Sequence, residues 1–210
     1  MTKKHLSIMI ITSITILLPI LVGVLLWEQL PQQLPIHWNM AGEVDSWGSK
    51  PMVVIGMPLV LLALHWIAIL ATLSDPKKRN HPQKILALLY WLVPTLSIVL
   101  MALTYSAGTG SEIRVEKICT MLVGLLLVFI GNYLPKAQQN YTIGIRLPWT
   151  LHSEENWNKT HRLAGWIAVV CGLAILFFGF FGLLWPIPLI LLILVIVPLI
   201  YSYLLHRKGV

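Results

Sequence analysis

The stretch NYTIGIRLPWTLHSEENWNKTHR, at residues 140–162, holds more polar residues that could do chemistry than any other part of this 210-residue chain. Arg146 lies close to a glycine, and this pairing predicts a turn that presents the guanidinium group. Glu154, Glu155 and His161 could form a recognition site or a proton-sensitive site with it, because histidine can titrate near neutral pH. The same residue types are also typical of a capped, salt-bridged helix start. The sequence leaves both interpretations open.

A new helix is expected to begin inside this stretch. Pro148 prevents a helix from running through it, and the residue before a proline is driven towards an extended conformation. Thr150 or Ser153 can cap the new helix, and Glu155 and Lys159 are spaced as a helical ion pair. The candidate recognition residues at this end of the protein are Asn132, Lys136, Asn140, Gly144, Arg146, Pro148, Trp149, Glu154, Glu155, Trp157, His161 and Arg162.

A second polar stretch, LPQQLPIHWNMAGEVDSWGSKP, fills residues 30–51. His37, Glu43 and Asp45 carry groups that can bind metals, but their spacing matches no closed metal site. The glycines indicate turns, so we expect a polar loop that caps the helices or faces a ligand. The candidate residues of this loop are Pro35, His37, Trp38, Gly42, Asp45, Trp47, Gly48 and Lys50.

Catalytic chemistry finds no support in the motifs. The chain contains no HExxH, GxSxG or phosphate-loop sequence. His152 and Glu155 have an HxxE spacing, but no nearby third ligand completes a site. Cys119 and Cys171 both fall in apolar segments and are typical of packing residues. We therefore expect no catalytic residue, no metal and no cofactor, and we predict that the protein is not an enzyme.

Composition places these polar stretches in a membrane protein. The chain is 57% hydrophobic and 11% charged, with a mean hydropathy of +0.80, whereas a soluble domain carries roughly 25% charged residues. A backbone in lipid must satisfy its own hydrogen bonds, so each long apolar segment should be a helix. The sequence therefore predicts an all-α, polytopic membrane protein with six transmembrane helices. The apolar segments are residues 6–26, 52–73, 85–105, 118–134, 163–184 and 187–205.

Two features inside the predicted spans bear on packing and function. Glycines recur every seven residues in the fourth and fifth spans, and small residues at such spacing let helices approach closely. His65 is the plainly ionisable residue within a span, and such residues are functional candidates. A hydrogen bond from His65 to a neighbouring helix is the favoured interpretation, with a functional role as the alternative.

The basic residues predict the orientation. Twelve of the 15 lysines and arginines fall on one side of the predicted spans, and this side should be cytoplasmic. Both termini and the loop 135–162 are then cytoplasmic, and the loop 28–51 lies outside. The same bias accounts for the net charge of +7, so we expect no direct contact with nucleic acid.

The motifs resemble one known family. The run IGIRLPWTL, with SEENWNKTHR behind it and GNYLPK before it, resembles the C-terminal signature of the SdpI family. LPIHWNMAGEVDSWGSKP resembles the small N-terminal domain that accompanies this signature in many members. The resemblance implies two modules: an N-terminal two-helix membrane domain at residues 1–75, and a C-terminal four-helix domain at residues 76–210.

Membership would imply a multi-pass protein of the bacterial cell membrane that gives immunity to a secreted antimicrobial peptide toxin. The resemblance also implies signalling, in which such a protein holds a helix-turn-helix repressor at the cytoplasmic face. The partners would then be the toxin outside, the repressor inside and the lipid bilayer. Two alternatives from other classes are a small ion-coupled transporter that uses His65, and a metal-dependent membrane enzyme that uses His152, His161 and glutamates.

Overall fold

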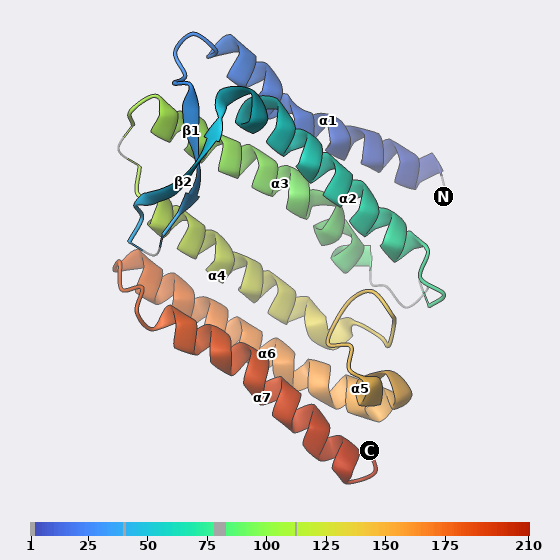
Figure 1. The fold of residues 1–210 in the computed structure, drawn as a ribbon. Coiled ribbons are helices and arrows are strands. Elements are labelled where there is room, and N and C mark those ends of the chain that lie inside the picture. The colour runs from blue at the N-terminus through green and yellow to red at the C-terminus, as the bar shows by residue number, and fades with distance from the viewer. Residues whose placement is uncertain (1–2, 40, 78–82, 112) are drawn as a thin grey trace. The chain divides into compact units, whose positions relative to one another are not determined.

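The structure is a computed structural model that describes residues 3–39, 41–77, 83–111 and 113–210. Within these ranges six helices are long and apolar enough to cross a membrane, which confirms the prediction of a six-span helical protein. The sequence did not predict the two-stranded hairpin in the loop 28–51. The elements are α1 (Lys3–Leu25), β1 (Gln33–Trp38), β2 (Val44–Ser49), α2 (Met57–Leu73), α3 (Gln83–Gly108), α4 (Val115–Tyr133), α5 (Pro148–His152), α6 (Glu154–Phe180) and α7 (Ile187–Arg207) (Figure 1).

The chain packs into two compact units. The first unit holds residues 1–73 and 87–116, and the second holds residues 74–86 and 117–210. Most of α3 therefore packs with α1 and α2, whereas the modules implied by the family resemblance divide the chain at residue 75. That division concerns sequence modules and stays a prediction.

Helices α1 and α3 of the first unit are joined by hydrogen bonds to the backbone of α1. The Ser97 hydroxyl donates to the carbonyl of Ile16 at 3.0 Å, and the Tyr105 hydroxyl donates to the carbonyl of Pro19 at 3.0 Å. Both donors are buried, so each bond satisfies a polar group that would otherwise be costly in lipid.

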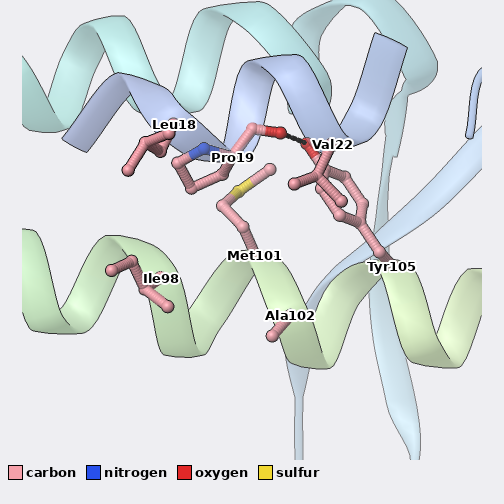
Figure 2. A pocket seen from close by; sticks show the side chains of 7 residues that line it. All are labelled: Leu18, Pro19, Val22, Ile98, Met101, Ala102 and Tyr105. Carbon is pink, nitrogen blue, oxygen red and sulfur yellow. Dashed lines mark hydrogen bonds between the residues drawn. The ribbon is translucent and has the colours of Figure 1, made fainter. Parts of the chain in front are cut away.

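An apolar hollow of about 290 Å³ lies beside the Tyr105–Pro19 bond, between α1 and α3 (Figure 2). Met101 and Tyr105 are buried at its base, whereas Leu18 and Val22 are exposed. No acidic, basic or histidine side chain lines it, and the hydroxyl of its one tyrosine, Tyr105, is used in the hydrogen bond to Pro19.

The hairpin covers the end of α3 within the first unit. Its strands are antiparallel, with an irregular register between Pro35 and Trp38. The side chain of Asn39 closes the turn by accepting the backbone N–H groups of Ala41 and Glu43. Leu34 is fully buried, and the Thr104 hydroxyl of α3 donates to the Pro35 carbonyl at 3.3 Å. These contacts fix the hairpin on the helices.

The second unit is built on close helix contacts. A Cβ atom placed on Gly131 of α4 would lie 2.7 Å from the Gly165 carbonyl oxygen of α6, and one on Gly124 would lie 2.9 Å from that of Gly172. Because real Cβ atoms essentially never approach so closely, glycine is required at this crossing. The predicted close packing of the glycine-bearing spans is confirmed.

Candidate functional site

The polar segment, residues 135–162, is folded by side chains that bond to its own backbone. Asn140 is fully buried. Its Oδ1 accepts the N–H groups of Thr142 at 3.0 Å and Ile143 at 2.7 Å, and its Nδ2 donates to the Gln138 carbonyl at 2.8 Å. One amide side chain therefore satisfies three backbone groups of a turn that has no helix or strand to satisfy them.

Asp75, from the connection between α2 and α3, anchors the same turn. Asp75 is buried, with 3% of its surface exposed. Oδ2 accepts the Tyr141 N–H at 2.9 Å and the Thr142 hydroxyl at 2.8 Å, and Oδ1 accepts the Lys77 N–H at 2.7 Å. A buried carboxylate needs such donors to offset its lost hydration. Asp75 was not predictable as an anchor from the sequence, because Tyr141 and Thr142 lie 66 and 67 residues further along the chain.

His161 has a structural part in the polar segment. Its Nε2 accepts the Ile145 N–H at 2.9 Å, and its Nδ1 lies 2.8 Å from the Trp157 carbonyl. An Nε2 that accepts must be unprotonated, so Nδ1 carries the proton and donates to Trp157. Gly144 allows the His161 ring to reach the Ile145 N–H. The φ of Gly144 is +116°, and a Cβ at this position would collide with His161 Nε2.

This geometry corrects one sequence interpretation. Both nitrogens of His161 are occupied by backbone groups, so the proposed pairing of His161 with Glu154 or Glu155 is not formed. Glu155 instead pairs with Lys159 at 2.6 Å, as predicted for a helical ion pair. Both side chains are exposed, and such a pair contributes little to stability.

The helix start follows the predicted pattern. Leu147, before Pro148, is extended with φ −109° and ψ 153°. The hydroxyl of Thr150 accepts the Leu147 N–H at 2.9 Å. The Ser153 hydroxyl caps α6 by accepting the Asn156 N–H at 3.1 Å. The predicted serine cap and the continuous run of α6 through His161 are therefore confirmed.

Trp149 joins the polar segment to α7. Its Nε1 donates to the Ser202 hydroxyl at 3.1 Å. Its ring stacks on His206 at a centroid distance of 5.8 Å and meets Tyr203 edge-on at 5.6 Å. Asn156 adds a further bond, from its Nδ2 to the Ser202 carbonyl at 3.0 Å.

Burial separates the predicted recognition residues into two groups. Asn140, Trp157 and His161 are fully buried, so these three predicted recognition residues do not lie on the surface. Trp157 is buried because its ring stacks on His161 at 4.0 Å and its Nε1 donates to the Ala137 carbonyl. Trp149 is half-buried. The exposed members are Asn132, Lys136, Gly144, Arg146, Pro148, Glu154, Glu155 and Arg162.

The hairpin candidates divide in the same way. Lys50 is buried. Its Nζ donates to the Trp27 carbonyl at 3.0 Å and lies 5.1 Å from the centroid of the Trp27 ring. Pro35 and Gly48 are buried, and Trp38 and Gly42 are half-buried. His37, Asp45 and Trp47 are exposed. His37 Nδ1 lies 2.5 Å from Asp45 Oδ1. Among the residues that the structure describes, no three His, Cys, Asp or Glu side chains are grouped to hold a metal.

His65 lies within the first unit and is fully buried. Its Nε2 is 2.9 Å from the Thr12 hydroxyl of α1, which confirms the predicted bond to a neighbouring helix. Its Nδ1 is buried without a hydrogen-bond partner among the described residues.

Comparison with known proteins places this chain in a family. The model of the SdpI/YfhL protein family matches residues 136–202, which include most of the polar segment. A domain of unknown function (DUF1648) matches residues 14–62, which include the hairpin. The chain is 32% identical over 196 residues to the protein named Immunity protein SdpI of Bacillus subtilis (strain 168), covering 92% of this chain and 91% of that protein. No solved structure matches the chain. With six candidate spans and this near full-length similarity, the chain is a multi-pass membrane protein that belongs to the SdpI/YfhL protein family.

Proposed function

We propose that this protein is an integral membrane immunity protein that protects its cell from a secreted antimicrobial peptide toxin. The observation that carries the proposal is the near full-length similarity to the Bacillus subtilis immunity protein, which spans both the hairpin and the polar segment. Protection of this kind acts by binding rather than by catalysis.

The positive-inside bias supports a toxin-facing role for the hairpin, because it assigns this loop to the outside. The hairpin exposes Asp45, His37 and Trp47, the last with 54% of its surface accessible. An exposed tryptophan suits the membrane interface, and the acidic groups would attract a cationic peptide. A toxin in the outer leaflet would therefore meet this surface first.

The second half of the proposal concerns the polar segment, which the same bias assigns to the cytoplasm. This segment would bind a cytoplasmic repressor and hold it at the membrane. Its support is an ordered loop that keeps Arg146 exposed while the buried Asn140 and His161 fix the backbone around it.

The deciding experiment measures membrane potential with a dye in toxin-sensitive cells. Three strains are compared: one with no immunity protein, one with the Bacillus subtilis relative and one with this chain. The toxin is the peptide that the relative resists. We expect both proteins to preserve the potential. If the relative preserves it and this chain, present in the membrane at equal abundance, does not, immunity to that toxin is contradicted.

A further inference from the structure

We propose that Tyr141, Lys77 and Arg146 form a preordered docking surface for an acidic segment of a cytoplasmic protein. The name Tyr141 surface is used below for these three residues. The inference rests on the proposed function, because that proposal puts the polar segment in the cytoplasm and gives it a protein partner. It adds which residues make the contact and what chemistry they recognise.

The backbone of Tyr141 is held on both sides while its ring stays outside. Its N–H donates to the buried Asp75 carboxylate at 2.9 Å, and its carbonyl accepts Arg146 Nη1 at 2.8 Å. The side chain is nevertheless 47% exposed. A large aromatic ring presented on a fixed backbone loses little conformational entropy on binding, which favours affinity.

Two cations are held at Tyr141, one beside its ring and one at its backbone carbonyl. Lys77 Nζ lies 5.4 Å from the ring centroid of Tyr141 and donates to the Oε1 atom of Gln139 at 2.6 Å. Gln139 is itself buried and donates to the carbonyls of Thr150 and Leu151. Arg146 is exposed and uses Nη1 for the Tyr141 carbonyl. Because a guanidinium has five N–H donors, Arg146 keeps donors that can meet a carboxylate.

The surrounding charge selects an acidic partner. The exposed acidic residues that follow the Tyr141 surface are Glu154 and Glu155, and Glu155 is paired with Lys159. Among the residues that the structure describes, the exposed basic residues of the second unit outnumber them: Lys84, Lys136, Arg146, Lys159, Arg162, Arg207 and Lys208. The positive-inside tendency explains how many cations there are. It does not explain why two of them are hydrogen-bonded into place at one half-exposed tyrosine, Lys77 near its ring and Arg146 at its carbonyl.

A protein segment fits this surface better than a lipid headgroup does. Tyrosine and arginine are enriched in protein–protein interfaces and among the residues that dominate their binding energy. A lipid phosphate would pair with the cations alone, whereas a protein segment can pair with them and also pack on the ring of Tyr141. We therefore assign the surface to a protein carboxylate, with the ring packing on the apolar part of the same segment.

The test uses the full-length protein in phosphatidylcholine nanodiscs and a dye-labelled synthetic peptide of glutamate and leucine. Fluorescence anisotropy gives the Kd for the wild type, for Arg146→Gln and for Arg207→Gln. The last is a matched control, because it removes the same charge from the same unit. We expect Arg146→Gln to weaken binding about tenfold and Arg207→Gln to change it by less than about twofold.

A second pair of variants controls for loss of binding that is caused by misfolding. Tyr141→Ser keeps both backbone bonds and should weaken binding, whereas Tyr141→Phe should retain it. Equal losses for Arg146→Gln and Arg207→Gln would overturn the proposal in favour of diffuse charge. No binding by the wild type, or unchanged binding by Tyr141→Ser, would also overturn it. So would displacement of the bound peptide by soluble glycerol phosphate, the headgroup of phosphatidylglycerol, since the site would then favour a lipid phosphate. This binding assay uses no toxin, so loss of peptide binding can be distinguished from loss of immunity, which the membrane-potential assay measures.

Discussion

Replacing Asp75 with alanine should release the turn of the polar segment. The carboxylate accepts the backbone N–H groups of Lys77 and Tyr141 and the hydroxyl of Thr142. The hydroxyl can rotate to another acceptor, but the two N–H groups cannot. Leaving a buried donor unsatisfied costs about 1–3 kcal/mol. Lys77 and Tyr141 both lie partly exposed, so we take the lower part of this range for each, a total of about 2–4 kcal/mol.

This loss can be measured by hydrogen–deuterium exchange of the full-length protein in nanodiscs. Amides such as those of Tyr141 and Ile143 exchange through local opening, whose free energy sets the rate. A loss of about 2–4 kcal/mol corresponds to exchange about 30-fold to 700-fold faster, at about 1.4 kcal/mol per factor of ten. The isosteric change Asp75→Asn keeps one acceptor oxygen and should give a smaller acceleration.

Asp45→Ala is the matched control, because Asp45 is an exposed aspartate whose side chain bonds His37 on the hairpin. It should leave exchange in the polar segment unchanged. If Asp75→Ala also leaves the Tyr141 and Ile143 amides at their wild-type rates, the carboxylate does not hold the turn, and the basis of the Tyr141 surface is lost.

Three further predictions test other parts of the structure. Gly144→Ala should lower the thermal midpoint of unfolding in detergent by more than Gly110→Ala does. Both glycines have a positive φ, but a Cβ would collide with a neighbour, His161, only at Gly144. Equal shifts of the midpoint would contradict this close contact. Thr12→Val leaves His65 Nε2 without its partner and should cost about 1–3 kcal/mol, whereas Thr15→Val, which loses only a bond within α1, should cost less in the same melting assay. In a chain without native cysteines, a cysteine at position 46 should react with an impermeant maleimide in intact cells and one at position 207 should not; the reverse pattern would invert the topology.

Local and periodic features of this protein were predictable from the sequence. The spans follow from long apolar runs, which the bilayer requires to be helical. The Ser153 cap was predictable because cap and recipient N–H are three residues apart. The glycine spacing indicated a close crossing because small residues along one helix face let the backbone of a neighbouring helix approach closely.

Contacts between distant residues were not predictable in the same way. No pattern near Asp75 shows that its acceptors face Tyr141 and Thr142, which lie far along the chain. His161 stands beside glutamates in the sequence, yet the fold turns its ring nitrogens towards the backbone of Ile145 and Trp157. The hairpin was missed because Pro35 and the glycines interrupt the alternation that identifies a strand.

The abundance of polar residues in the segment 135–162 therefore has a physical cause that does not depend on a binding partner. A loop without regular secondary structure must still satisfy its buried N–H and C=O groups. Asn140, Thr150 and His161 meet this need with side-chain bonds to the backbone, and all three are fully buried. These residues are scaffold, and replacing them tests folding. Arg146 and the ring of Tyr141 remain exposed on that scaffold, so substitutions at these two positions are the ones that separate recognition from stability.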